Sequence, residues 1–292
     1  MRTRPLGPDA FAVSVVGFGG MPLSIPGRPD DEATAIRVIH AALDGGATLI
    51  DSADAYALGE SDVGHNERLI AKALRQWKGE RNGIVVATKG GIERRGSEWT
   101  LNGRPEYIRR ACDRSLKALG VERIDLYQYH RPDPGVPLLE SVGAFADLQR
   151  AGKIRWIGLS NVDVDEIEAA RTVAPVTTVQ NRLNPFFREA LSGGVVRHCD
   201  REGIGFLAYS PVGGGRLNKK LPAHPTLLDI ARRHSCSPHA VALAWVLAQG
   251  RSVLIIPGAR TVEHVRDALT VAEIELAEAD RTAIDQAEFS RA

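Results

Sequence analysis

Short apolar runs alternate with longer amphipathic segments along almost the whole chain. The runs are rich in β-branched residues, and in the longer segments apolar positions recur every three or four residues, as on a helix with one buried face. The pattern predicts eight strands, at 13–19, 48–51, 84–89, 124–130, 154–160, 176–180, 205–209 and 253–256. One or two helices are predicted after each strand, at 31–43, 66–78, 105–119, 136–151, 163–172, 192–202, 225–234 with 238–249, and 262–269.

Strands that read as continuous apolar runs imply a parallel sheet covered by helices. Eight such units suit an α/β fold of the (β/α)8 TIM-barrel type better than an open doubly wound sheet. The open sheet would need GxGxxG after its first strand, and residues 17–22 do not complete that pattern. We also expect a short N-terminal hairpin over residues 1–12, with its turn at 7–9, and an extra C-terminal helix at 278–288. Without a linker or low-complexity segment, residues 1–292 are expected to form one domain.

Composition narrows the classes of function. Lys plus Arg is 37 against 36 for Asp plus Glu, and no basic block suggests a nucleic-acid partner. No apolar run is long enough for a membrane span, and the start of the chain lacks the apolar core of a signal peptide. Cys112, Cys199 and Cys236 lie far apart and read as free thiols in a cytoplasmic protein without a metal site. We expect a monomer or a small homo-oligomer.

Polar side chains gather where a barrel needs them, at the C-terminal ends of its strands. Every predicted strand from the second on ends in groups that can donate or accept a hydrogen bond: Asp51, Lys89, His130, Ser160 with Asn161, Gln180 with Asn181, Tyr209 with Ser210, and Arg260. Tyr56 follows Asp51 on the same loop.

Each of these residues has an ordinary structural interpretation when taken alone. Lys89 could be a solvated cation, His130 a hydrogen-bonded structural histidine, and Asp51 a loop cap. Together with Tyr56, however, they come from strands two, three and four, which are neighbours in a barrel. We therefore predict that the four form one site, and we expect Asp54, on the same loop, to be a solvated carboxylate.

The four residues compose a site for proton transfer. A tyrosine has a reference pKa of about 10, and an ammonium beside its oxygen is expected to lower that pKa. Asp51 would hold Lys89 and keep it charged, while His130 would orient a substrate oxygen. Tyr56 would then protonate an alkoxide forming on a carbonyl carbon. Because no side chain supplies a hydride, a nicotinamide cofactor is implied.

At this point the sequence resembles the aldo-keto reductases over nearly its whole length. The stretches that carry the resemblance are RPLG, GFGG, LIDSADAY, VVATKGG, SLKALGVERIDLYQYHRPDP, GKIRWIGLSN, VQNRLNP, AYSPVGGG and IIPGARTVEHV. The resemblance implies a (β/α)8 barrel that reduces small-molecule aldehydes or ketones with NADPH. It also places Asp51, Tyr56, Lys89 and His130 on the family's catalytic tetrad.

The same resemblance implies contacts to the cofactor. Those to the nicotinamide carboxamide fall on Ser160, Asn161 and Gln180. Tyr209 would stack on the nicotinamide ring and leave its other face open to the substrate. The further contacts, including a backbone cradle for the pyrophosphate, fall on Gly20, Met21, Asp51, Ser210, Val212 and Gly214.

Departures from the family pattern occur where the adenosine phosphate would bind. Gly258, His264 and Ala268 stand where relatives often carry cationic or amide side chains, which leaves Arg260 as the nearest cation. NADPH is the expected cofactor, with NADH as the alternative. The segment at 216–225 is short, so we expect weak retention of the cofactor.

Two other functions remain as alternatives. Some members of the superfamily serve as nucleotide-binding regulatory subunits with little turnover, and a barrel lyase or isomerase could use Lys89 as a Schiff base. The substrate loops leave a further choice open, because Met21, Leu58 and Trp99 could either wall the pocket or pack against the barrel rim. The short C-terminal tail suggests an open pocket.

Overall fold

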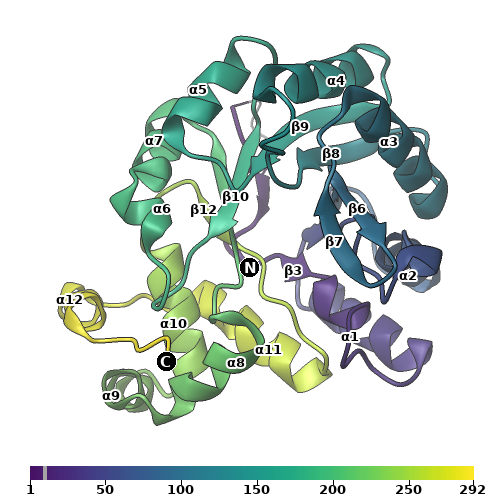
Figure 1. Cartoon of the computed structure of the whole chain (residues 1–292). Coiled ribbons are helices and arrows are strands. Elements are labelled where there is room, and N and C mark those ends of the chain that lie inside the picture. The colour runs from purple at the N-terminus through teal and green to yellow at the C-terminus, as the bar shows by residue number, and fades with distance from the viewer. Residues whose placement is uncertain (9–11) are drawn as a thin grey trace.

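The computed structural model describes residues 1–8 and 12–292, and its helices surround a central sheet (Figure 1). Within those residues, eight parallel strands pair in the order β12-β11-β10-β9-β8-β5-β4-β3. Their bounds are Phe18–Gly19 (β3), Leu49–Asp51 (β4), Val85–Gly90 (β5), Ile124–Tyr129 (β8), Ile154–Ser160 (β9), Thr178–Arg182 (β10), Gly205–Tyr209 (β11) and Val253–Ile255 (β12).

The sheet is closed between its first and last strands. Gly17 donates its amide to the carbonyl of Ile255 at 2.8 Å, and the amide of Ile255 donates to the carbonyl of Val15 at 3.0 Å. A further parallel bridge joins Gly19 to Gly258. The eight strands therefore form the predicted barrel, and their C-terminal ends meet at one rim.

Helices cover the outer face of the sheet. The helices are α1 (Glu32–Asp44), α2 (His65–Gln76), α3 (Pro105–Leu119), α4 (Leu138–Arg150), α5 (Val164–Arg171), α6 (Glu189–Ser192), α7 (Val195–Glu202), α8 (Gly214–Leu217), α9 (Pro225–Arg233), α10 (Pro238–Leu247), α11 (Val262–Thr270) and α12 (Glu278–Gln286). The predicted bounds of α3, β9 and β11 match the structure residue for residue. Among the residues described, no helix is long and apolar enough to cross a bilayer.

The predicted N-terminal hairpin is present as β1 (Thr3–Pro5) and β2 (Ala12–Ser14), which pair antiparallel. Asp9, predicted as part of its turn, lies outside the described residues. Leu6 and Val13 pack into one buried cluster with inward-facing strand residues such as Leu207. The hairpin therefore plugs the N-terminal end of the barrel, opposite the rim where the polar strand ends meet.

Three predictions about local structure were wrong. The helix expected at 192–202 is interrupted, because α6 ends at Ser192 and α7 begins only at Val195, with Gly194 at a φ of +76° between them. The first barrel strand was expected at 13–19. Residues 13 and 14 instead belong to β2 of the hairpin, and the barrel strand β3 begins only at Phe18. The Ser14 hydroxyl donates to the carbonyl of Val16 at 2.8 Å, which competes with strand pairing between the two. The substrate loop expected to carry Trp99 after the third barrel strand contains an antiparallel hairpin, β6 (Ile92–Arg95) with β7 (Glu98–Leu101). This hairpin carries Trp99 to the rim, near His130 at the end of β8.

Candidate active site

Lys89 lies at the centre of the site and is fully buried. Its Nζ donates to Asp51 Oδ2 at 2.6 Å, to the carbonyl of Ser52 at 2.8 Å and to the hydroxyl oxygen of Tyr56 at 3.0 Å. An ammonium has no acceptor, so the oxygen of Tyr56 must accept in this contact. The proton of the Tyr56 hydroxyl is therefore free to point away from Lys89.

Asp51 is held from its other side by two glutamines. Its Oδ1 accepts from Gln180 Nε2 at 2.8 Å and from Gln128 Nε2 at 3.2 Å. The two glutamines are themselves joined, since Gln180 Nε2 also donates to Gln128 Oε1 at 3.2 Å. Gln128 was not among the predicted site residues, although it pairs in register with Lys89 on the neighbouring strand and therefore faces the same side of the sheet.

Burial and charge set the protonation states of this group. Burial alone would lower the pKa of Lys89, but Asp51 and Tyr56 outweigh it and raise that pKa, as predicted for a held ammonium. Burial raises the pKa of Tyr56 more than Lys89 lowers it, so the expected net decrease was wrong. Burial, and then the charges of Lys89 and Arg131, hold the pKa of His130 well below its usual range. At neutral pH the site thus has a neutral phenol, a charged ammonium and a neutral imidazole.

His130 and Trp99 flank the Tyr56 ring. The ring centroids of Tyr56 and His130 are 5.7 Å apart at 83°, and Trp99 lies 6.1 Å from Tyr56 and 6.5 Å from His130. Trp99 is 44% exposed, so it stands at the mouth of the site rather than in the core. Of the three predicted wall residues, Trp99 and Met21 line the cavity into which Tyr56 and His130 open. Leu58 instead lines a separate shallow hollow.

The ends of β9 and β11 are tied together by polar side chains. Tyr209 donates its hydroxyl to Asn161 Oδ1 at 2.7 Å, and Asn161 Nδ2 donates to Ser160 Oγ and to the carbonyl of His130, both at 3.0 Å. Asn161 and Ser210 have φ angles of +62° and +47°, in the left-handed region that non-glycine residues rarely adopt. Such strain at a rim residue points to a functional constraint.

These groups open into one cavity of about 530 Å³, a size typical of ligand sites. Of the residues predicted for catalysis and cofactor binding, those that line it are Met21, Asp51, Tyr56, His130, Ser160, Asn161, Gln180, Tyr209, Ser210, Val212, Gly214, Gly258, Arg260 and His264. Lys89 and Gly20 lie behind its wall. Gly20 donates its amide to the carbonyl of Asp51 at 2.8 Å, and a Cβ there would stand 2.5 Å from Asn66 Oδ1.

Asp54 differs from its prediction as a solvated carboxylate. It is fully buried, and its Oδ2 accepts from Arg114 at a long 3.5 Å. Burial first, and then the charge of Glu67, raise the pKa of Asp54 well above its usual range. Glu67 is also fully buried and accepts from the Thr88 hydroxyl at 2.6 Å. Asp54, on the loop that carries Tyr56, thus forms a buried acidic pair with Glu67.

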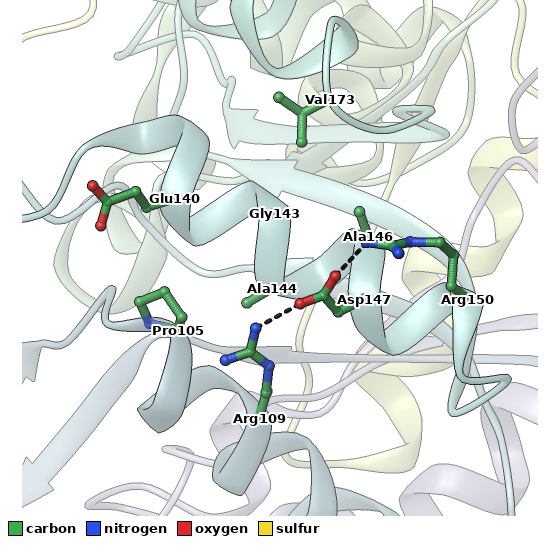
Figure 2. Close-up of a pocket in the computed structure, with 9 residues that line it drawn as sticks. All are labelled: Pro105, Arg109, Glu140, Gly143, Ala144, Ala146, Asp147, Arg150 and Val173. Carbon is green, nitrogen blue, oxygen red and sulfur yellow. Dashed lines mark hydrogen bonds and ion pairs between the residues drawn. The ribbon is translucent and has the colours of Figure 1, made fainter.

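A second hollow lies on the outside of the barrel, between α3 and α4 (Figure 2). Three of its four charged side chains are paired with one another, because Asp147 binds Arg109 at 2.5 Å and also Arg150. Side chains from the strand ends do not take part in it. The cavity at the rim is therefore the candidate active site.

Comparisons of the sequence with a family profile and with known proteins indicate the same family. The sequence profile described as "Aldo/keto reductase family" matches residues 15–288. A Glycine max protein named "Probable aldo-keto reductase 1" is 37% identical over 97% of this chain and 87% of its own length.

Solved structures resemble the chain in the same way. The glycerol dehydrogenase of Gluconobacter oxydans superposes with a TM-score of 0.84 at 31% identity, covering 97% of this chain and 93% of its own. An aldo-keto reductase from Klebsiella pneumoniae in complex with NADPH gives a TM-score of 0.80 at 25% identity, covering 98% and 95% of the two chains.

Proposed function

Since this chain belongs to the aldo/keto reductase family of oxidoreductases, we propose that it reduces an aldehyde or ketone to an alcohol with NADPH as cofactor. The observation that carries the proposal is the chain of contacts from Asp51 through Lys89 to Tyr56, which ends at the cavity. NADPH, when bound, supplies the hydride.

Tyr56 is proposed as the general acid. Its pKa is raised above the ordinary value, so the phenol is protonated at neutral pH and has a proton to give. As that proton leaves toward the substrate oxygen, the Lys89 ammonium 3.0 Å away stabilises the forming phenolate. Asp51 keeps the ammonium charged and in place. The charge that develops on Tyr56 is thus met by a group that needs no rearrangement.

His130 is proposed to orient the substrate oxygen. Its depressed pKa keeps the imidazole neutral, and a neutral imidazole donates one hydrogen bond without giving up its proton. The 5.7 Å between the centroids of His130 and Tyr56 leaves both rings able to reach one carbonyl oxygen in the cavity. The two side chains together would fix the carbonyl for attack on one face.

The residues of the rim fit a dinucleotide. Ser160, Asn161 and Gln180 present amide and hydroxyl groups to the cavity, and Tyr209 offers an aromatic face. Gly213 and Gly214 have φ angles of +91° and +75°, which only glycine adopts readily and which let backbone amides turn toward an anion. We propose that these groups hold the nicotinamide and the pyrophosphate.

The preference for NADPH over NADH is proposed to depend on Arg260 and His264, which line the same cavity beyond Gly258. Arg260 is partly engaged, since it donates to the carbonyls of Pro22 at 3.3 Å and of Pro26 at 3.1 Å. We therefore expect a modest preference for NADPH. The short segment after Gly215 supports weak retention of the cofactor, and a submicromolar dissociation constant for NADPH would contradict this.

The test is a panel of aldehydes and ketones with NADPH and NADH side by side, followed by the loss of absorbance of the reduced cofactor. Oxidation of NADPH that depends on the carbonyl compound supports the proposal. Tight NADPH binding without oxidation across the panel would instead indicate a regulatory subunit. A Schiff-base role for Lys89 is disfavoured by its raised pKa, because an amine must lose its proton to attack a carbonyl.

A further inference from the structure

The substrate end of the cavity carries one uncompensated charge. The charged residues that line the cavity are Asp51, Arg131 and Arg260, with histidine taken as neutral. Asp51 is paired with Lys89. Arg131 follows β8 and Arg260 follows β12, and these strands lie on opposite sides of the closed sheet. Arg131 therefore marks the end beside His130.

Arg131 has no hydrogen bond or ion pair with any residue that the structure describes. The nearest acid along the chain, Asp133, is already used: its two oxygens accept from the amides of Gly103 and Gly135, both at 2.9 Å. The charge of Arg131 nevertheless reaches the site, since it helps to lower the pKa of His130. A guanidinium in this position is open to a ligand.

The wall near Arg131 is apolar and held in place. Trp99 lies under the guanidinium of Arg94, whose carbon is 4.5 Å from the ring centroid. Arg94 itself is buried and donates to four backbone carbonyls, of Ala55 at 3.2 Å, Ala57 at 2.7 Å, Leu58 at 3.0 Å and Ser97 at 2.9 Å. These bonds join the Trp99 hairpin to the loop of Tyr56. Trp99 is thus a preorganised platform for a flat substrate.

We propose that the preferred substrates are carbonyl compounds with a flat apolar body and an oxyanion, a carboxylate or a phosphate, which Arg131 binds while Trp99 packs against the body. This inference rests on the proposed function and adds the class of substrate. The guanidinium fork matches both oxyanions in geometry, with two parallel N–H donors.

The experiment compares charged aldehydes with matched neutral ones. The charged substrates are 3- and 4-formylbenzoate and 4-formylphenyl phosphate, and the neutral controls are the two formylbenzamides and 4-methoxybenzaldehyde. The carboxamide withdraws electrons more than the carboxylate does, so for the two formylbenzoates intrinsic reactivity works against the expected preference. The quantity to measure is the ratio of kcat/KM for each charged aldehyde to that for its neutral control.

We expect a ratio of at least about tenfold in the wild type for the carboxylate or the phosphate, as for a charge-assisted bidentate contact. Arg131→Met should bring that ratio close to one, and Arg131→Lys should leave an intermediate ratio because it keeps the charge and loses the fork. Arg95→Met, which removes an exposed arginine from the nearby hairpin, should keep the wild-type ratio. Whichever oxyanion gives the larger ratio, the carboxylate or the phosphate, is the one assigned to the preferred substrates.

A wild-type ratio near one for all three charged aldehydes would overturn the inference, and so would an Arg131→Met ratio equal to that of the wild type. In both cases the proposed function would stand, because the neutral aldehydes would still be reduced. If neither charged nor neutral aldehydes were reduced, the proposed function would be refuted and the substrate class with it.

Discussion

Replacing Asp51 by asparagine removes one charge from a pair that is almost completely buried. The side chains of Lys89 and Asp51 are 1% and 4% exposed, and Nζ lies 2.6 Å from Oδ2. An asparagine side chain cannot accept both from Lys89 and from the two glutamines, because only one of its two terminal atoms is an acceptor. If its oxygen accepts from Lys89, its amide group faces the amide donors of Gln180 and Gln128.

The cost follows from the burial. Breaking a buried pair by removing one partner leaves an uncompensated charge and typically costs about 3–5 kcal/mol of unfolding free energy. The matched control is Asp147→Asn, because Asp147 lies 2.5 Å from Arg109 and the two side chains are 41% and 46% exposed. An exposed pair of this kind contributes at most about 1 kcal/mol.

The dependence on pH has a definite sign. In the wild type, the raised pKa of Lys89 means that its pair stabilises the fold fully below the unfolded value of about 10.5, and this stabilisation is lost only as the pH rises through the higher folded pKa. Without Asp51, burial should lower the pKa of Lys89. The deficit of the Asp51→Asn variant should therefore be largest near neutral pH and shrink toward about pH 10.

Urea unfolding followed by tryptophan fluorescence measures both effects, with the double variant Asp51→Asn, Lys89→Met as a further arm. The double variant should be more stable than Asp51→Asn alone, because it removes the unpaired charge. A loss below about 1 kcal/mol in Asp51→Asn, equal to that of the Asp147→Asn control, would refute the reasoning. So would a deficit that grows with pH.

Three further predictions concern the surroundings of the site. Burial raises the pKa of Asp54, so the unfolding free energy of the wild type should fall as the pH rises through that raised value. Urea unfolding over about pH 5–8 should show that this free energy falls less steeply with pH in Asp54→Asn, and equal slopes in the two proteins would contradict the prediction. Arg94→Met leaves four carbonyls without their donor and should cost at least about 3 kcal/mol by urea unfolding, together with a lower kcat; a loss below about 1 kcal/mol would contradict it. In Gly205→Ala the new Cβ would meet the Leu6 carbonyl oxygen at 1.9 Å, which should cost about 1–3 kcal/mol of unfolding free energy. Gly143→Ala, with open space around its Cβ, should cost nothing, and equal effects of the two substitutions would contradict the tight packing of the N-terminal hairpin against the barrel.

The barrel and its rim could be predicted from the sequence because both depend on short-range patterns. Continuous apolar runs gave the strands, and the rule that parallel strands end at one rim brought Asp51, Lys89 and His130 together. Tyr56 lies on a loop, yet its distance along the chain from Asp51 is short enough to limit where it can go. The roles of these residues remain proposals, which the geometry supports.

What the sequence did not reveal depends on contacts between distant segments. Nothing local shows that Arg94 binds the loop of Tyr56, or that Gln128 shares Asp51 with Gln180. Asp54 read as a solvated carboxylate because its burial comes from packing among other elements. The direction of the net pKa shift of Tyr56 could not be predicted either, because burial raises this pKa while Lys89 lowers it, and only the three-dimensional structure shows which effect is larger.

The most direct test of the proposed chemistry is Tyr56→Phe, measured for NADPH affinity by fluorescence and for hydride transfer in a single turnover. The substitution removes the acid and leaves the residues proposed to hold the cofactor, so NADPH should bind within about twofold of the wild type while the rate falls by about 10²–10⁴. A variant that transfers hydride as fast as the wild type would contradict the assignment of Tyr56 as the proton donor.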